Sequence, residues 1–479
     1  LTETGTNTGI FWGSIAFDAT SGIGVVDGDL DVSPGDNLVV HYDDASDDWG
    51  HPAVCEDDAV YAAATYWGHI TEDTTWTVAN SPYIISGDLL IDSGVTLTIE
   101  AGVEIRFIAD YDQENLGNYW YDSELLTYGT LAAQGTAANP IIFTSTAETP
   151  QPGDWGQILV DSSGTADMTY CEVRYATSGI YAYGSVVNLT DCLVEQCSGN
   201  GIIMGWEGAD GTILRTTVQN CGSTGISIGE MSDAVLRECV SQGNGGCGLS
   251  VYYTAPLVED CRFLNNGWTA VYVRSYEEIP QAFRRCTVSG SDYGLFFEGV
   301  SLLVEGCAIS GEYCGVYLSG TAKVTLSGCD LSGSGSYAVL NYSIYDQNCR
   351  FNYWGDAATA EMEAGGNPKN ISYIYDQYDE ASFGLVNYSA WLDAPGGTPA
   401  PHGNTGLVLF TDEAGDEVPI YTGDQAMITL WDADLNTDPG QVEEATVTVT
   451  STTQTEAETV TLTETGTNTG IFWGSIAFD

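Results

Sequence analysis

The longest regular pattern in the chain lies between residues 81 and 354, where short runs of alternating apolar and polar residues are interrupted by glycine. From residue 171 onward a cysteine anchors each run, and Thr216 takes the place of one cysteine. Successive anchors are 21, 24, 23, 22, 25, 21, 22 and 20 residues apart, and the cysteines are Cys171, Cys192, Cys239, Cys261, Cys286, Cys307, Cys329 and Cys349. The residue two positions after each anchor is generally apolar, so both side chains point to one side of a strand. A second strand is predicted eight or nine residues after each anchor.

A repeat this short cannot bury a core alone, so each repeat must stack on its neighbours. This predicts an all-β fold whose centre is a parallel β-helix. The anchor cysteines then form a ladder of small buried thiols in the core. Cys197 and Cys221 each lie five residues after an anchor in neighbouring coils, which makes them the candidates for a disulfide between coils. The coils contain no CxxC motif and no histidine, which argues against a zinc site.

Residues 1–18, LTETGTNTGIFWGSIAFD, recur letter for letter at 462–479. One hypothesis is that the sequence spans one period, plus an overlap, of a tandem array. The other is that one end of a single chain replaces the other end in a neighbouring subunit, as in donor-strand addition. Both hypotheses predict a head-to-tail polymer of copies of this chain, and the number of repeats stays open. The candidate assembly residues are Leu1, Phe11, Trp12, Leu462, Phe472 and Trp473.

The segment before the second copy predicts strands at 407–410, 425–432, 445–452, 458–465 and 471–479. The first copy continues with strand-like runs at 24–32 and 37–44. Joined through the shared segment, these runs predict about seven strands, the number in an immunoglobulin-like β-sandwich, here split across the repeat boundary. The predicted organisation is the later part of a sandwich at 1–60, the β-helix with its caps at 66–394, a Pro/Gly linker at 395–405 and the first part of the next sandwich at 406–479.

Several segments of the coil resemble a known family. TWTVANSPYIISGDLLIDSGVTLTIEAGVEIRF (75–107), GDWGQILV (153–160) and FNYWGDAATAEME (351–363) resemble right-handed parallel β-helix repeat proteins of the pectate-lyase-like superfold, over about residues 66–394. The resemblance implies the fold but no single activity, because the family includes lyases, hydrolases and surface proteins. The VTVT…ETVTLTETGTNTGIF segment is similar to immunoglobulin-like modules of very large bacterial and archaeal surface proteins, which implies an extracellular or cell-surface location.

The net charge of the chain limits the kinds of partner that it can bind. It has 67 acidic and 11 basic residues and a net charge of −56, which excludes nucleic acid and disfavours an anionic membrane surface. No apolar run is long enough for a transmembrane helix. Residues 1–105 contain 19 acids and residues 371–479 contain 18, and neither segment has a lysine or arginine. Salt or a bound metal must therefore relieve the repulsion within these segments.

Calcium is the predicted metal. Asp432, Asp434, Asn436 and Asp438 occupy positions 1, 3, 5 and 7 of a calcium loop, and Glu443 occupies position 12. Thr437 replaces the turn glycine of an EF-hand, and Asx turns would explain the same density of Asp and Asn. Asp43 and Asp44 are candidates to complete the site from the other half of the sandwich.

No catalytic residues are predicted. A lyase would need calcium-binding acids beside a Lys or Arg base, and a hydrolase would need paired carboxylates. The charged run from Arg274 to Glu278, near Arg284 and Arg285, is the strongest candidate, but alternating charges on an exposed turn more often form surface ion pairs of little consequence. Four aromatic residues, Tyr111, Tyr119, Trp120 and Tyr121, crowd a predicted long loop. They either contact glycans or a neighbouring subunit, or cap the first coils.

These observations together predict a structural repeat unit of an extracellular filament or cell-surface layer, stabilised by calcium. The alternative is a surface adhesin or glycan-binding module. A polysaccharide lyase or hydrolase is the third hypothesis.

Overall fold

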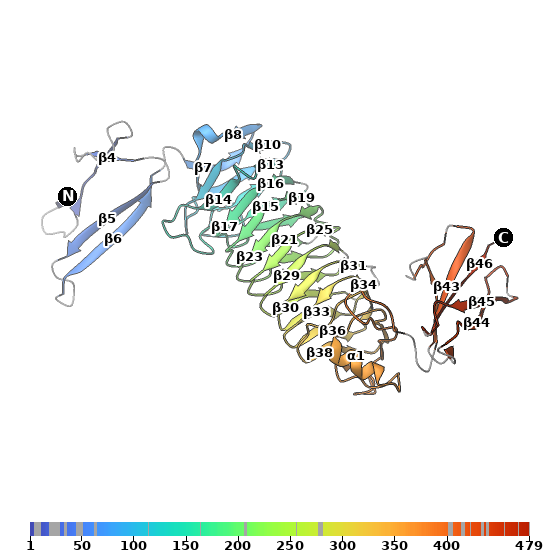
Figure 1. Ribbon diagram of the computed structural model, residues 1–479. Coiled ribbons are helices and arrows are strands. Elements are labelled where there is room, and N and C mark those ends of the chain that lie inside the picture. Colours follow the sequence, from blue (N-terminus) through green and yellow to red (C-terminus); the bar gives the residue numbers. More distant parts are fainter. Residues whose placement is uncertain are drawn as a thin grey trace. The chain divides into compact units, whose positions relative to one another are not determined.

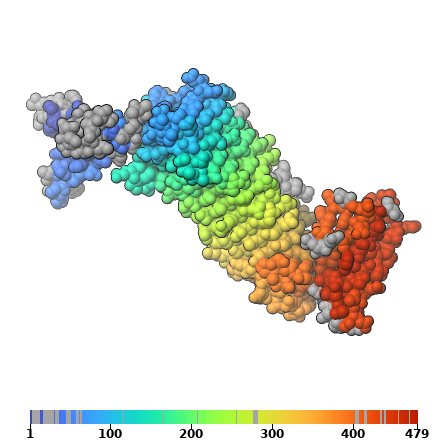
Figure 2. All heavy atoms as spheres, turned by 45° about the horizontal axis from the view of Figure 1, so that its top comes forward, coloured from blue at the N-terminus to red at the C-terminus, as the bar shows by residue number. Residues whose placement is uncertain are grey.

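The computed structural model describes residues 1–3, 11–18, 29–32, 36–44, 51–61, 65–113, 115–162, 164–205, 208–254, 256–275, 281–400, 406–412, 417–421, 423–432, 435–436, 440–454, 456–467 and 469–478. It divides into two compact units, Leu1–Ala234 and Val235–Asp479, and each is described by itself. Figure 1 shows that the later part of the first unit and the earlier part of the second consist of short strands stacked coil after coil. In Figure 2 the same coils form successive bands of colour.

Each complete coil contributes three strands, which pair in parallel with the strands of the coils before and after it. We call the strands that carry the anchors face 1, the next strands along the chain face 2 and the third strands face 3. In the first unit, β7 (Thr65–Ile70) and the long β9 (Tyr83–Ile91) begin the stack. The strands that follow are β11 (Glu104–Phe107), β14 (Ile141–Ser145), β17 (Cys171–Arg174), β20 (Leu193–Glu195) and β23 (Thr217–Gln219) on face 1; β12 (Leu125–Thr127), β15 (Ile158–Asp161), β18 (Ile180–Tyr183), β21 (Ile202–Gly205) and β24 (Ile226–Ile228) on face 2; and β8 (Thr74–Trp76), β10 (Thr96–Ile99), β13 (Thr130–Gln134), β16 (Thr165–Thr169), β19 (Val186–Thr190) and β22 (Thr212–Leu214) on face 3. A 3-10 helix at Val78–Asn80 joins β8 to β9.

The second unit repeats the arrangement. Its strands are β26 (Val240–Gln242), β29 (Arg262–Leu264), β32 (Thr287–Ser289) and β35 (Ala308–Ile309) on face 1; β27 (Leu249–Tyr252), β30 (Thr269–Arg274), β33 (Tyr293–Glu298), β36 (Cys314–Gly320), β38 (Tyr337–Ser343) and β40 (Ile374–Tyr375) on face 2; and β25 (Val235–Arg237), β28 (Leu257–Glu259), β31 (Gln281–Arg284), β34 (Ser301–Glu305), β37 (Lys323–Ser327), β39 (Gln347–Asn348) and β41 (Val386–Asn387) on face 3. Each predicted period of about 22 residues is therefore one coil. The predicted anchor strand lies on face 1 and the predicted second strand on face 2, and each coil also has a third strand on face 3.

One residue makes the bend between face 3 and face 1. The residue before every anchor except Cys349 adopts a positive φ, for example 54° at Glu238, 55° at Asp260 and 53° at Arg285. This left-handed conformation costs non-glycine residues about 1–2 kcal/mol each. The anchor side chain closes the bend, because the Cys261 thiol donates to the carbonyl of Glu259 at 3.2 Å. At the one anchor without cysteine, the Thr216 hydroxyl donates to the carbonyl of Leu214 at 3.1 Å. A small side chain with a donor is thus what the position requires, which explains why Thr can replace Cys.

The interior of the coils is filled by the alternate residues of all three faces. All eight anchor cysteines and Thr216 are between 0 and 4% exposed. Most of the residues two positions later, such as Val218 and Phe263, are also buried. Phe351 is the exception to the predicted pattern. It is only partly buried, has a φ of 61°, and its ring lies 5.7 Å from that of Trp431, because the chain leaves the coil there.

Beyond Phe351 the predicted closing segment includes α1 (Asp356–Glu363), which buries Met362 beside the last coils. The C-terminal part is a five-stranded antiparallel sheet in the order β42 (Leu407–Thr411), β43 (Gln425–Trp431), β46 (Ile471–Ala477), β45 (Glu458–Glu464) and β44 (Glu444–Val449). The described N-terminal residues form three strand pairs: β1 (Thr2–Glu3) with β2 (Phe11–Trp12), β3 (Ala16–Asp18) with β4 (Asp29–Asp31), and β5 (Asn37–Asp44) with β6 (Ala53–Val60). The described residues of these terminal parts do not form a complete immunoglobulin-like sandwich in either unit.

A matched pair of substitutions tests the role of the anchor. Thr and Val have nearly the same shape, but only Thr keeps a donor for the Glu259 carbonyl. We therefore expect the Cys261→Thr protein to be more stable than the Cys261→Val protein by about 1 kcal/mol, the net value of one hydrogen bond. Urea denaturation of the two proteins measures the difference. Equal stability would show that the anchor is selected for size alone.

Candidate functional site

The repeated segment forms the same hairpin at both ends of the chain. In the C-terminal copy, β45 and β46 pair with Thr463 opposite Trp473 and Glu464 opposite Phe472. In the N-terminal copy, β1 and β2 pair with Thr2 opposite Trp12 and Glu3 opposite Phe11. These are the same pairs, 461 residues apart. The register is therefore a property of the 18-residue segment itself.

The surroundings of the two copies differ sharply. In the C-terminal copy Leu462 and Phe472 are 0% exposed, within a core that includes Leu430 of β43. In the N-terminal copy the equivalent residues Leu1 and Phe11 are 90% and 57% exposed. Burying one such side chain stabilises a protein by about 1.5–3 kcal/mol. The N-terminal copy is therefore the same hairpin without the neighbouring strands that give it a core.

The β5–β6 hairpin, which follows the N-terminal copy, is also incomplete. Val39, Val40, Tyr42 and Val54 are between 55% and 65% exposed. A two-stranded hairpin in water is marginally stable, and it normally packs against a further sheet or helix. Strands β5 and β6 therefore have the character of edge elements that need a partner sheet.

A buried carboxylate holds the turn of the complete copy. The Glu464 carboxylate accepts hydrogen bonds from the amides of Thr469 at 2.8 Å and Gly470 at 2.9 Å. Burial raises the pKa of Glu464, but these amide bonds outweigh it and lower the pKa below its usual value. Glu3 is the corresponding residue of the N-terminal copy.

The described residues do not test the predicted calcium site, which stays a prediction. Asp434 and Asp438 lie outside the described residues, and Asp43 and Asp44 belong to β5, opposite Val54 and Ala53. Asp432 follows β43, and its amide donates to the carbonyl of Gly470. The described part of the chain contains no group of three or more His, Cys, Asp or Glu side chains arranged to hold a metal ion. No geometry for calcium can be derived from these residues.

The predicted aromatic loop is held down by two buried carboxylates. Asp88, on β9, accepts hydrogen bonds from the amides of Leu116 and Gly117 at 2.6 Å each and from Glu124 at 2.8 Å. Glu124 accepts hydrogen bonds from the Tyr119 amide at 3.0 Å and from the Gln157 side chain at 2.8 Å. Both acids are 0% exposed. Burial raises the pKa of Asp88 to about 6 and that of Glu124 to about 7.

The four aromatic residues of the loop have different environments. The Tyr119 hydroxyl lies 3.2 Å from that of Ser178, so this ring is part of the cap. Tyr111 is 48% exposed, Trp120 is 76% exposed and Tyr121 is 77% exposed. The loop therefore covers the first coils, and three of its rings remain accessible to a ligand or a neighbouring subunit.

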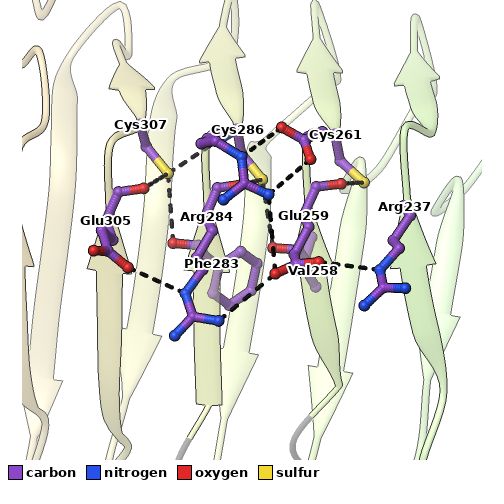
Figure 3. Close-up of polar contacts among 11 residues, drawn as sticks. Arg237, Val258, Glu259, Cys261, Phe283, Arg284, Cys286, Glu305 and Cys307 are labelled. Carbon is purple, nitrogen blue, oxygen red and sulfur yellow. Dashed lines mark hydrogen bonds and ion pairs between the residues drawn. The ribbon is translucent and has the colours of Figure 1, made fainter.

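The basic residues form ion pairs between coils. On face 3 of the second unit, Arg237, Glu259, Arg284 and Glu305 occupy one in-register column of alternating charge (Figure 3). The pair distances are 3.0 Å for Arg237–Glu259, 3.6 Å for Arg284–Glu259 and 3.1 Å for Arg284–Glu305. Arg285 pairs with Asp260 at 2.8 Å.

Arginine side chains elsewhere in the coils also form ion pairs, and one of them is the predicted candidate for a catalytic base. Arg174 bonds Glu195 of the next coil, and Arg215 bonds Asp191. Arg274, the candidate base, lies 3.7 Å from Glu298, while Glu277 and Glu278 lie outside the described residues. Among the described arginines, all but Arg262 form a carboxylate ion pair. These residues stabilise the stack modestly, by up to about 1 kcal/mol per exposed pair.

The cysteines form the buried column that the sequence predicts. Figure 3 shows Cys261, Cys286 and Cys307 on successive strands beside the ion pairs. Hydrogen bonds from Cys239 and Cys286, together with burial, raise the pKa of Cys261, which keeps its thiol neutral. Cys197 and Cys221 are buried and hydrogen-bonded to each other, and the structure has both as free thiols. The disulfide between them stays a prediction.

Comparison with known proteins identifies the fold. A family model described as "Right handed beta helix region" matches residues 156–280, and one described as "Pectate-lyase like beta helix domain" matches residues 68–188. With the three-stranded coils, these matches show a right-handed parallel β-helix protein. Neither of the two models extends over 1–60 or 406–479. None of the helices among the described residues has the length and apolarity needed to cross a bilayer.

No curated protein matches the chain. Among solved structures, the catalytic unit of a thermostable GH87 alpha-1,3-glucanase from Streptomyces thermodiastaticus is similar over 67% of this chain, with 12% identity and a TM-score of 0.32. The chain covers 64% of that relative, slightly less than two thirds of its length.

The two copies of the repeat offer an internal control for the role of the hairpin. Phe472→Ala should destabilise the C-terminal sheet by about 3–5 kcal/mol, because it leaves a cavity at a fully buried site. Phe11→Ala should cost less than about 1 kcal/mol in the same chain, since that ring is already mostly in water. Hydrogen exchange of the β43 and β46 peptides and of the β2 peptide measures both effects. Equal losses at the two sites would contradict the difference in burial.

Stability should depend on pH through Glu124. A carboxyl whose pKa rises on folding binds protons in the folded state that the unfolded chain releases, so stability is greatest at low pH and falls as pH rises through about 7. We expect the free energy of unfolding to be about 1–3 kcal/mol higher at pH 5.5 than at pH 8 because of this group. Glu124→Gln should remove that share of the pH dependence.

The control for this experiment is Glu100→Gln, a change at an exposed acid. It should leave the pH dependence as it is in the unaltered protein. Thermal melts of the three proteins at the two pH values measure the effect, and an unchanged slope in the Glu124→Gln protein would refute the assignment.

Proposed function

We propose that this right-handed parallel β-helix protein is a structural repeat unit of an extracellular filament or cell-surface layer. The units join head to tail. At each joint, the strands β3 to β6, which follow the N-terminal copy of the repeated segment, complete the sheet formed by β42 to β46 at the C-terminal copy. The single observation that carries the proposal is the contrast between Leu1 and Phe11, which are 90% and 57% exposed, and the identical Leu462 and Phe472, which are 0% exposed.

The two ends carry complementary sets of strands. The C-terminal part contains β42 to β46, with the repeated segment in β45 and β46. Among its described residues, the N-terminal part contains the same segment in β1 and β2, followed by β3 to β6. Joined through one copy, the two parts contain about the seven strands of an immunoglobulin-like sandwich. This supports a split sandwich as the joint between units.

Both routes to a polymer remain available to the proposal. In a tandem array, the segment is shared by two covalently continuous units. In strand exchange, the N-terminal copy of one molecule replaces 462–479 in another, where it would gain the burial of Leu462 and Phe472. The matching hairpin register in the two copies supports either route.

Calcium belongs to the proposal as the neutralising ion. The two end segments of the chain, which include the joining parts, carry 37 acids without a lysine or arginine, 19 in residues 1–105 and 18 in residues 371–479. Each bound Ca²⁺ removes two negative charges and needs oxygen ligands of the kind that Asp432, Asp434, Asn436, Asp438 and Glu443 offer.

Two other functions have some support. Trp120 and Tyr121, more than three quarters exposed, suit a glycan-binding adhesin. The match of residues 68–188 to a pectate-lyase like β-helix model supports a polysaccharide lyase or hydrolase. The pairing of Arg274 with Glu298 opposes the latter, because a base must be free to take a proton.

The assembly proposal is tested with a tandem protein in which residues 1–461 are followed directly by 1–479. Its inner repeated segment then has both the preceding and the following strands. We expect the inner β5 and β6 to exchange amide hydrogens at least tenfold more slowly than β5 and β6 of the single chain, because a completed sandwich buries them. The outer β5 and β6 of the same tandem protein serve as the control. Equal exchange rates at the inner and outer copies would refute the joint.

The calcium part is tested separately. Calcium at millimolar concentration should raise the melting temperature of the tandem protein at low salt, and excess EDTA should reverse the rise. The protein with Asp434→Asn and Asp438→Asn should show a smaller rise. No response to calcium in the unaltered tandem would remove the metal from the proposal and leave the joint standing.

A further inference from the structure

Face 2 of the second unit carries a column of aromatic rings that the sequence analysis did not single out. Tyr272, Phe296 and Tyr317 occupy one in-register column on β30, β33 and β36. Their ring centroids are 5.4 Å and 4.3 Å apart. Tyr342 lies outside this register column, because it pairs with Ser319, and Tyr375 pairs with Leu340, but their rings extend the run of aromatic contacts from Tyr317 at 5.4 Å and 5.2 Å. Phe296 and Tyr317 are stacked with their planes 29° apart, and the other neighbouring rings are tilted by 30–53°. These ring contacts stabilise the packing of successive coils.

A second row of rings lies beside this column and is turned across it. The row consists of Trp268, Tyr293, Tyr313 and Tyr337, and the angles between neighbouring ring planes are 68°, 80° and 77°. Tyr293 is also at 71° to Phe296. Neighbouring rings of this outer row meet edge to face and are not stacked on one another. Trp268 is 45% exposed and Tyr313 is 43% exposed, so the outer row presents aromatic surface to solvent.

The charges beside the two rows are largely internal pairs. Arg274 lies 3.7 Å from Glu298, and the Tyr272 hydroxyl donates to the same carboxylate at 2.8 Å. Two exposed acids, Asp292 and Glu312, precede Tyr293 and Tyr313. On a chain of net charge −56, this surface is mainly aromatic rings and phenol hydroxyls, with acids at its margin.

Such a surface suits sugars. The flat apolar side of a pyranose ring packs on an aromatic ring, and phenol and carboxylate oxygens can bond its hydroxyls. Successive coils are about 4.8 Å apart, close to the length of one sugar residue in an extended polysaccharide. A chain that runs along the stack can therefore place successive sugars on successive coils.

Charge selects among the occupants. Anionic polysaccharides and nucleic acids are repelled by a net charge of −56, and a second copy packed side by side on this face would meet the same repulsion. An uncharged chain is not repelled. We propose that the outer aromatic row, together with the tyrosines of the stacked column, binds an uncharged polysaccharide lying along the stacking direction of the coils. This inference does not depend on the head-to-tail joint.

The test uses the full chain with four uncharged polysaccharides as probes: cellulose, β-1,3-glucan, xylan and mannan. Polygalacturonate is the charged comparison. We expect co-sedimentation with at least one uncharged polymer, little dependence on salt, and no binding to polygalacturonate. Trp268→Ala and Tyr313→Ala should each weaken binding by about tenfold, while melting temperatures show that the proteins remain folded.

The matched control is Trp120→Ala, which removes a more exposed ring from the other unit. It should bind as the unaltered protein does. Absence of binding to all four uncharged polymers would overturn the proposal, and so would unchanged binding by both face 2 variants or binding lost only with Trp120. If Trp268→Ala instead abolished side-by-side bundling of the protein without any glycan, the face would be assigned to a second copy and the proposal would again fail. None of these results would alter the hydrogen exchange expected at the joint.

Discussion

Parallel backbone pairing between successive coils is the constraint on which the rest of the structure depends. A coil of about 22 residues has too few apolar side chains for a core of its own, and its backbone groups need partners outside the coil. The in-register pairing of β17 with β20, and of β30 with β33, supplies those partners. A coil is therefore stable only as a member of a stack.

In-register pairing also explains the columns of like residues. When the pairing places the same position of each repeat above the last, thiols meet thiols, as Cys286 meets Cys307, and rings meet rings, as Phe296 meets Tyr317. Charges must then alternate, because like charges in one column would repel. The sequence of Arg237, Glu259, Arg284 and Glu305 meets that requirement. Two of the eleven basic residues, Arg237 and Arg284, are held in ion pairs by this column.

A stack of coils has two ends with unpaired strand edges, and the modules that flank the coils bear on this problem. In one unit the stack begins with β7 and β8, and the aromatic loop lies against the coils from Asp88 to Ser178. In the other unit α1 lies beside the last coils. The antiparallel strands beyond these caps carry the repeated segment, complete in one copy and partial in the other. We infer that stiffness belongs to the coils and connection to the flanking strands, which is the division of labour that the proposed filament requires.

The sequence by itself determined the features that depend on local pattern. The spacing of the cysteines from Cys171 to Cys349 predicted the length of each coil. Thr216 can occupy one anchor position because the bend needs only a small side chain with a hydrogen-bond donor. The 18-residue repeat also determined its own hairpin register. The tertiary structure decided what depends on distant partners: the burial of Leu462 but not of Leu1, the exit of Phe351 toward Trp431, and the buried positions of Asp88 and Glu124. The aromatic rows belong to this second group. Tyr272, Phe296 and Tyr317 are 24 and 21 residues apart, and only the register between coils brings their rings together.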